Sequence, residues 1–117
     1  MLVKRIVANI ATPDPAAARA FYGNVLGLEF AMDHGWIVTF AAPAVEARPQ
    51  VSFLSEGGSG TPLPDLSVEV DDVDGMLTRV TRAGIAIEYG PADEPWGVRR
   101  FYVRDPFGRL INILQHK

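Results

Sequence analysis

The sequence has 117 residues, of which 48% are hydrophobic and 21% charged, and its net charge is −3. This length and composition predict one globular domain, and the mild negative charge argues against nucleic acid as a partner. The lack of cysteine excludes disulfides, thiolate nucleophiles and cysteine-based zinc sites. There is no apolar run near the roughly 20 residues of a membrane span, nor the long apolar segment of a signal peptide. We therefore expect a cytoplasmic protein without a membrane partner.

The first half of the chain, residues 2–56, begins with a run of β-branched residues that predicts a strand over 3–11. Asp14 can cap the next helix, and Pro15 fits its first position, where an amide hydrogen has no partner. The helix is expected over 16–25, and its apolar stripe consists of Ala17, Ala20, Phe21 and Val25. Strands are then expected over 28–32, 36–41 and 51–54, with a turn at 33–35 and a loop at 42–49.

The second half, residues 63–117, repeats this order after a glycine-rich linker at 57–62. A strand is expected over 66–70, and Asp72 caps a helix that continues to residue 83. Gly75 inside this helix weakens it by up to about 1 kcal/mol relative to alanine. Three further strands are expected over 85–89, 98–104 and 110–115, with a type I turn at 105–108.

The two halves therefore form a repeat, since the helix starts Asp14 and Asp72 are 58 residues apart. Neither half is large enough to be stable alone, so they are expected to fold together or to pair between chains. The sequence predicts an α+β fold in which two tandem βαβββ modules, 2–56 and 63–117, form a curved mixed sheet around a shared cleft.

Three segments carry a family resemblance that covers nearly the whole chain. These are Ala20-Phe21-Tyr22-Gly23-Asn24-Val25-Leu26-Gly27-Leu28, the strand-to-helix segment 68–74, and the final hairpin with Pro95-Trp96-Gly97 and Asp105-Pro106-Phe107-Gly108. In this order they resemble the glyoxalase/bleomycin-resistance/extradiol-dioxygenase group, the vicinal oxygen chelate superfamily. The resemblance implies the paired βαβββ fold as a single domain, but not one particular reaction, because the fold hosts many functions.

Side chains alternate between the faces of a strand, so the apolar positions identify the face under each helix. Leu66, Val68 and Val70 are expected to face the helix, which leaves Asp65, Ser67 and Glu69 toward the cleft. The repeat gives Val7, Asn9 and Ala11 as their counterparts. On the last strand Ile111 and Ile113 pack under the helix while Leu110, Asn112 and Leu114 face the cleft, and Ser52 is the counterpart of Asn112.

Metal enzymes of the superfamily place His, Glu or Gln at four positions that hold Val7, Ser52, Asp65 and Asn112 in this chain. Valine cannot bind a metal, a neutral serine is a poor ligand, and only Asp65 is charged. Zinc and iron sites require several His, Cys or carboxylate donors. We therefore expect neither a metal nor another cofactor.

The remaining titratable residues give no catalytic assignment. His34 lies in a turn and His116 next to the last residue, so both are expected to be solvated, although a histidine base remains open. Asp65 and Glu69 could form a catalytic carboxylate pair, but solvated or hydrogen-bonded side chains at the cleft mouth are favoured.

Aromatic residues supply the other signal. Trp36 and Trp96 are expected in loops that border the cleft, with Phe30, Phe40, Phe101 and Tyr102 as candidate walls; core filling is the alternative for each phenylalanine. Aromatic walls with a few polar groups suit a flat organic ligand. The complete set of expected ligand contacts is Asn9, Trp36, Phe40, Ser52, Asp65, Ser67, Glu69, Trp96, Arg99, Phe101, Tyr102 and Asn112.

The resemblance and the substituted metal positions together favour a metal-free binding protein, like the bleomycin-resistance members of the superfamily. It would sequester a flat aromatic natural product or drug, and the resemblance implies a homodimer. The alternative is a lyase, isomerase or dioxygenase-type enzyme that acts on a small oxygenated substrate. A third possibility is a partner-binding subunit whose cleft binds no ligand.

Overall fold

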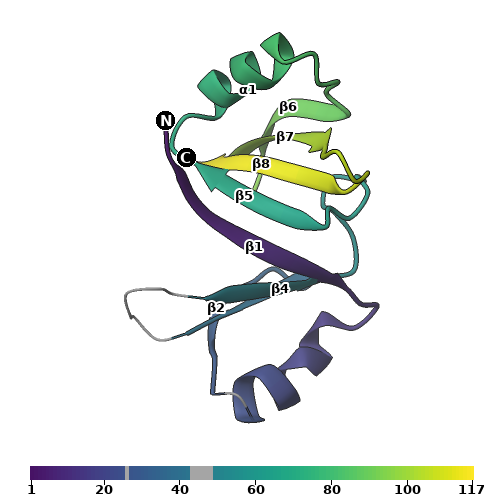
Figure 1. The fold of residues 1–117 in the computed structure, drawn as a ribbon. Helices are drawn as coiled ribbons and strands as arrows, with labels where there is room; N and C mark the ends of the chain where they lie inside the picture. Colours follow the sequence, from purple (N-terminus) through teal and green to yellow (C-terminus); the bar gives the residue numbers. More distant parts are fainter. Residues whose placement is uncertain (26, 43–48) are drawn as a thin grey trace. The chain divides into compact units, whose positions relative to one another are not determined.

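The computed structural model describes residues 1–25, 27–42 and 49–117. The chain divides into two compact units: unit 1 contains Met1–Ile6 and Pro64–Lys117, and unit 2 contains Val7–Leu63 (Figure 1). Strand β1 (Val3–Ala11) contributes to both units, because the boundary falls between Ile6 and Val7. Strands and helical segments are present in each unit, so the α+β fold class is confirmed.

Unit 1 is built from a sheet and one α-helix. Its elements are β5 (Leu66–Val70), α1 (Val73–Arg82), β6 (Tyr89–Glu94), β7 (Val98–Arg104) and β8 (Leu110–His116). The strands lie in the order β5-β8-β7-β6, with β5 and β8 parallel and the other pairs antiparallel. Val70, Val73, Val80, Phe101, Val103 and Ile113 form the buried core between helix and sheet. The predicted helix-facing positions of β5 and β8 are therefore confirmed for Val68, Val70, Ile111 and Ile113.

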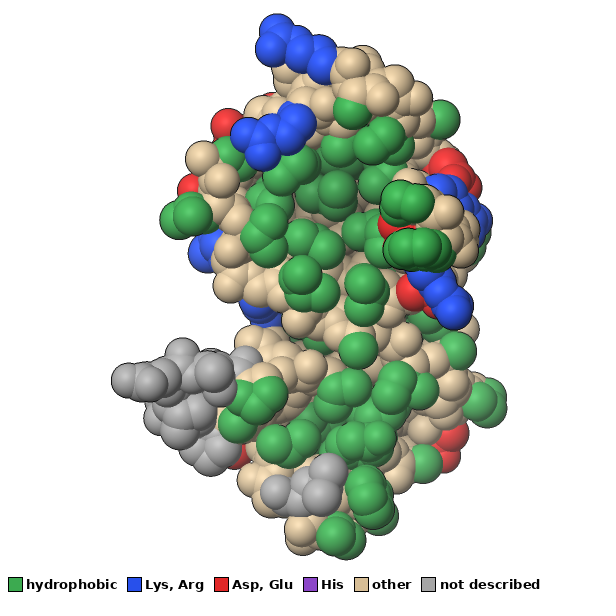
Figure 2. Space-filling model, viewed as in Figure 1, with side chains coloured by type: hydrophobic (Ala, Val, Ile, Leu, Met, Phe, Trp, Pro, Cys, Tyr) green, Lys and Arg blue, Asp and Glu red, His purple; other side chains and the backbone are tan. Residues whose placement is uncertain are grey.

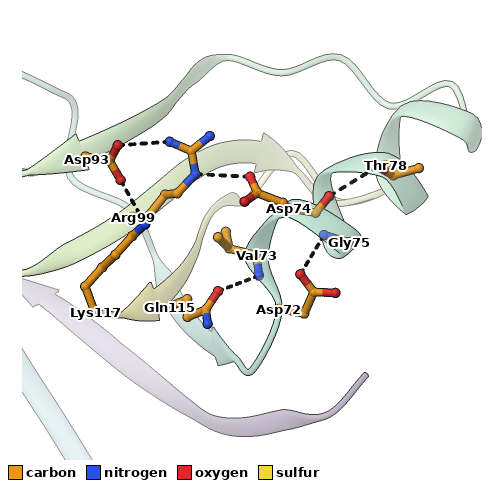
Figure 3. A network of polar contacts seen from close by, with 9 residues as sticks. All are labelled: Asp72, Val73, Asp74, Gly75, Thr78, Asp93, Arg99, Gln115 and Lys117. Carbon is orange, nitrogen blue, oxygen red and sulfur yellow. Dashed lines mark hydrogen bonds and ion pairs between the residues drawn. The ribbon is translucent and has the colours of Figure 1, made fainter.

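Helix α1 begins where the sequence predicts. The Asp72 carboxylate accepts a hydrogen bond of 3.0 Å from the Gly75 amide, and the Val73 amide donates to the side chain of Gln115 on β8 (Figure 3). These contacts provide partners for two of the amides that a helix start leaves unpaired. The chain leaves the helix at Gly84, whose φ of +78° favours glycine.

The strand that follows α1 differs from the prediction. Residues 85–88 are not a strand, and β6 instead spans Tyr89–Glu94, across Gly90 and Pro91. Its pairing with β7 shifts register between Tyr89 and Ala92, so the proline lies at an irregularity of an edge strand. Proline has no amide hydrogen to donate to a neighbouring strand, and such a position tolerates it.

Unit 2 contains the other strands and two short helical segments. The strands are β2 (Glu29–Asp33), β3 (Ile37–Ala41) and β4 (Gln50–Leu54), and their order is β2-β3-β4-β1. Strand β1 runs parallel to β4, as β5 does to β8 in unit 1. Val38, Phe40 and Phe53 form the buried core, and Ala18, Tyr22, Leu28 and Val51 pack against it. The expected loop at 42–49 lies mainly outside the described residues.

The first helix differs from the predicted α-helix. Its residues form a 3₁₀ segment, η1 (Pro15–Ala18), followed by a π-helical segment, η2 (Arg19–Val25). Asp14 makes no side-chain cap hydrogen bond, whereas Pro15 lies near the helix start as expected. The packed face is that of Ala18 and Tyr22, not the predicted stripe, and Phe21 and Val25 are exposed. The prediction was wrong because alanines on every side of this segment leave the apolar face ambiguous.

Candidate functional site

The face of the unit 1 sheet that points away from α1 carries a grid of polar and aromatic side chains. Its strand pairs set Glu69, Leu114 and Arg100 in one row and Ser67, Asn112 and Tyr102 in the next. We call this region the polar face of unit 1. It consists of the two rows, the residues around Arg100 (Tyr89, Glu94 and Trp96) and the residues around Glu69 (Arg5 and His116). The predicted cleft-facing positions Ser67, Glu69, Leu114 and Asn112 all lie on it.

Asn112 lies at the centre of the polar face. It is only 8% exposed, and its side-chain amide donates a 3.1 Å hydrogen bond to the Ser67 hydroxyl. Its Oδ1 is buried without a hydrogen-bond partner. A buried carbonyl oxygen without a partner is unfavourable by about 1–3 kcal/mol, so an acceptor in this position is a feature that a bound ligand would explain.

Glu69 is held by the side chains of Arg5 and His116. Its Oε1 accepts a 2.6 Å hydrogen bond from Arg5 Nε, and its Oε2 contacts His116 Nδ1 at 2.5 Å. Burial would raise the pKa of the Glu69 carboxyl, but the hydrogen bond with His116 and the charge of Arg5 together hold it below its ordinary value. His116 is therefore not simply solvated as predicted, although its side chain is about half exposed.

Arg100 forms the second charged cluster. Its guanidinium pairs with Glu94 at 2.6 Å, and both side chains are almost fully buried. It also donates to the Tyr102 hydroxyl and lies 4.9 Å from the centre of the Trp96 ring. The Tyr89 hydroxyl donates to the same Glu94 carboxylate. The buried Glu94 carboxylate therefore has both a positively charged partner, Arg100, and hydrogen-bond donors.

The sequence prediction omitted Arg100, Glu94 and Tyr89 from the site. The expected ligand contacts included Arg99 but not Arg100, its neighbour on β7. Strand alternation from Tyr102 would have placed Arg100 on the polar face, so the signal was present.

Unit 2 carries one polar row in the equivalent position. Asn9 on β1 lies beside Ser52 on β4, which lies beside Thr39 on β3. The Thr39 and Ser52 hydroxyls are buried and 2.6 Å apart. The internal repeat therefore reproduces the row of Ser67, Asn112 and Tyr102, with Thr39 as a residue that the sequence prediction missed.

A hollow of about 300 Å³ borders this face of unit 2. It is lined by Ala11, Thr12, Pro13, Leu54 and Ser55, none of which titrates near neutral pH. Ala11 and Leu54 are paired two positions along the strands from Asn9 and Ser52. The hollow therefore lies next to the polar row of Asn9, Ser52 and Thr39, and its own lining is mainly apolar.

Three expected ligand contacts lie on the opposite, helix-side faces. Phe40 and Phe101 are fully buried in the cores of unit 2 and unit 1, so core filling, not a cleft wall, describes them. Arg99 lies between Asp74 at 3.0 Å and Asp93 at 3.2 Å (Figure 3). The hydrogen bond to Asp74 is the main cause that raises the pKa of Arg99. These placements correct the prediction, which did not apply strand alternation to Phe40 and β7.

The other expected contacts lie nearer the surface. Trp36 precedes β3 and is half-buried, and so is Trp96, which packs over Arg100. Asp65 precedes β5, where its carboxylate accepts from the Leu110 amide at 3.0 Å and lies 3.8 Å from Arg109. Asp65 and Glu69 therefore each contact partners of their own.

The donors at the four family metal positions do not fit a divalent metal. Val7 is a buried apolar side chain, and the Ser52 hydroxyl is engaged with Thr39. Asp65 is occupied by a backbone amide, and Asn112 offers one neutral oxygen. Neither the two side chains in unit 2 nor the two in unit 1 provide the several His, Cys or carboxylate donors that zinc or iron requires. Within 1–25, 27–42 and 49–117, no three His, Asp or Glu side chains gather as a metal site elsewhere.

Comparison with known proteins gives the family. Residues 4–113 match the model of the Glyoxalase/Bleomycin resistance protein/Dioxygenase superfamily. The chain belongs to this superfamily. The resemblance seen in the sequence is therefore confirmed. No curated protein sequence matches the chain.

Solved structures share the fold at low sequence identity. Methylmalonyl-CoA epimerase from Mycobacterium tuberculosis is 20% identical with a TM-score of 0.72, and the match covers 99% of this chain and 90% of that one. A structure described as NAD-dependent benzaldehyde dehydrogenase from Legionella pneumophila is 18% identical with a TM-score of 0.74, covering 97% and 100%. A superfamily member from Vibrio splendidus 12B01 is 21% identical with a TM-score of 0.59, covering 97% and 98%. At these identities the similarity shows the fold alone.

Proposed function

We propose that this superfamily member binds a small, largely aromatic organic molecule without a divalent metal, and sequesters it without breaking a bond. The observation that carries the proposal is Asn112: a buried neutral amide with a free acceptor occupies a position where metal enzymes of the superfamily have a ligand. Tyr102 lies beside it on β7, and Trp96 covers Arg100 nearby. An aromatic ligand at this face would gain about 25 cal/mol per Å² of apolar area buried, before the entropic cost of association.

The second candidate is an isomerase or lyase that acts on a small oxygenated substrate. Glu69 and His116 form a carboxylate–imidazole pair, which is an arrangement suited to proton transfer. However, the pKa of Glu69 is lowered, so its carboxylate is a weaker base than an ordinary glutamate. A catalytic glutamate that removes a proton near pH 7 needs the opposite shift, so in such an enzyme Glu69 would orient the imidazole and His116 would act as the base.

We further propose that the protein forms homodimers. Apolar side chains gather on the surface shown in Figure 2. Separately, the exposed apolar side chains among the described residues of unit 2 include Ile10, Phe21, Val25 and Phe30. Exposed apolar side chains in this number favour association of copies over an isolated chain.

The binding proposal is tested with chelator-treated protein and a panel of flat aromatic compounds, followed by nuclear magnetic resonance titration. Replacement of Trp96 by alanine is expected to weaken binding by about ten-fold, since it removes an aromatic surface of the site. Phe107→Ala is the matched control, because Phe107 is 86% exposed in a turn and should leave binding unchanged. A requirement for added Ni²⁺, Zn²⁺, Fe²⁺ or Mn²⁺, with substrate turnover, would favour the enzyme instead.

A further inference from the structure

The charged groups on the polar face of unit 1 are already matched with each other. Glu69 is paired with Arg5 and His116, and Arg100 is paired with Glu94. The partners lie 2.5–2.6 Å apart, which is hydrogen-bond distance. A charged ligand placed among them would bring a charge that has no counter-ion, and burial of an unpaired charge is strongly unfavourable.

The flanking carboxylates and arginines are matched as well. Asp65, two residues before Ser67, lies 3.8 Å from Arg109, and Arg104 pairs with Glu88 at 2.8 Å. These two pairs are partly exposed, and neither offers a buried free charge to a ligand.

Asn112 Oδ1 is the one polar side-chain atom in the described ranges that is buried without a partner. The amide nitrogen of the same side chain is already used in the bond to Ser67, so the group still available is an acceptor. A ligand that completes this bond must supply an N–H or O–H donor. Tyr102 beside Asn112, and Leu110 and Leu114 two positions away along β8, provide an aromatic and apolar setting for the rest of the ligand.

We propose that the ligand of this face is an uncharged aromatic molecule with a hydrogen-bond donor on or next to its ring, and that Asn112 Oδ1 receives this donor. The inference rests on the proposed binding function and narrows it to a ligand class. Asn112 and Tyr102 are 8% and 1% exposed. Binding at Asn112 Oδ1 therefore requires that neighbouring side chains move aside.

Matched probes test the inference in chelator-treated protein at pH 7. The probes are 2-naphthol, 2-methoxynaphthalene, 2-naphthoate and 2-naphthylmethylammonium, which share a ring system and differ in donor and charge. Titration of ¹⁵N-labelled protein gives their dissociation constants and reports on the Asn112 side-chain amide directly. We expect 2-naphthol to bind about ten-fold or more tightly than each of the other three, with a shift of the Asn112 resonances.

Two variants locate the effect at Asn112. Asn112→Leu should reduce the preference for 2-naphthol over its methyl ether to about one, because the acceptor is gone. Asn112→Asp should bind 2-naphthylmethylammonium most tightly of the four probes, because it places a carboxylate at the same point. This variant tests the role of residue 112 if Asn112→Leu does not fold. Asn24→Leu makes the same substitution on the exposed surface of unit 2 and should retain the wild-type preference.

The possible failures are distinct. Equal affinity of the wild type for 2-naphthol and its methyl ether, or tighter binding of a charged probe, overturns the inference while small-molecule binding stands. A 2-naphthol preference that survives in Asn112→Leu overturns the role of Asn112. Absence of binding by any probe contradicts both this inference and the proposed function.

Discussion

At the scale of single residues, the Arg100–Glu94 pair is the most buried charged contact of unit 1, with side chains 3% and 5% exposed. Its guanidinium also has Tyr89, Tyr102 and Trp96 rings within 5.4 Å, so hydrogen bonds and aromatic faces replace the water that it lost. A pair buried in this way fixes the position of its neighbours, including Trp96 at the proposed binding face.

Replacement of Arg100 alone is predicted to be costly. Arg100→Met leaves the Glu94 carboxylate buried without its counter-ion, so the free energy of unfolding should fall by about 3–5 kcal/mol. The double variant Arg100→Met with Glu94→Gln should recover much of the loss, since no unpaired charge remains. Arg104→Met is the control, because its pair with Glu88 is about half exposed and should contribute about 1 kcal/mol or less.

Urea unfolding of the four proteins measures these differences. Equal losses for Arg100→Met and Arg104→Met would show that the burial of the Arg100 pair has no energetic consequence.

Glu69 predicts a dependence of stability on pH. Its carboxyl has a lowered pKa in the folded chain, so the folded state favours the charged form more than the unfolded state does. The resulting stabilisation is fully present above the unfolded pKa and is lost as the pH falls through the lowered folded value. Wild type should therefore exceed Glu69→Gln in unfolding free energy at pH 7, and the difference should shrink in acid.

The comparison is made by urea unfolding at several pH values between neutral and acid. A difference between wild type and Glu69→Gln that grows as the pH falls would contradict the stabilising contacts of the Glu69 carboxylate with Arg5 and His116.

Alternation along strands predicted much of the candidate site. Ser67, Glu69 and Asn112 were placed on the correct face because the apolar positions of β5 and β8 are unambiguous. The bond partners were not predictable, since the strand pairing brings Arg5 and His116, from opposite ends of the chain, to the same carboxylate. Arg100 was missed because strand alternation was not applied to β7, where it places Arg100 on the same face as Tyr102.

At the scale of elements, α1 shows how a helix start constrains its own sequence. Gly75 lowers helix propensity, but a Cβ at this position would come within 2.3 Å of the Asp72 carboxylate that caps the helix. The glycine therefore makes room for the cap in its present geometry, which the sequence alone did not reveal.

A double-mutant cycle tests this coupling. In the Asp72→Ala background, Gly75→Ala should stabilise the protein by about 1 kcal/mol, which is the full difference in helix propensity. In the wild-type background the gain should be smaller, because the new methyl group displaces the capping carboxylate. Urea unfolding measures the cycle, and equal effects in both backgrounds would show that residue 75 and the cap are independent.

The elements of the second module were predicted better than those of the first. Helix α1 has an aspartate cap, a single apolar stripe and a terminal glycine, which agree with each other. The segment at 15–25 has alanines on several sides and an exposed Phe21, so its pattern did not fix the face or the helix type. Strand β6 was misplaced because Gly90-Pro91 reads as a strand end, although an edge strand with an irregular register accommodates it.

At the scale of the whole chain, the repeat gives each unit the same arrangement of strands. The parallel pair β1–β4 corresponds to β5–β8, and each pair carries a polar row on the face opposite its helical segment. The described residues contain no helix that is long and apolar enough to span a membrane. Family and fold could be predicted from the sequence because both modules keep the same order of strands and helical segments. The identity of the ligand could not be predicted, because it depends on the positions of a few side chains.

The central claim is that the substituted metal positions belong to a binding protein that needs no metal. Native mass spectrometry of chelator-treated protein, with 2-naphthol and with Ni²⁺, Zn²⁺, Fe²⁺ or Mn²⁺ added separately and together, tests it most directly. We expect a dimer that takes up the organic molecule to the same extent with and without metal, and no stoichiometric metal adduct. Uptake of one tightly held metal ion per chain, with organic binding only in its presence, would contradict it.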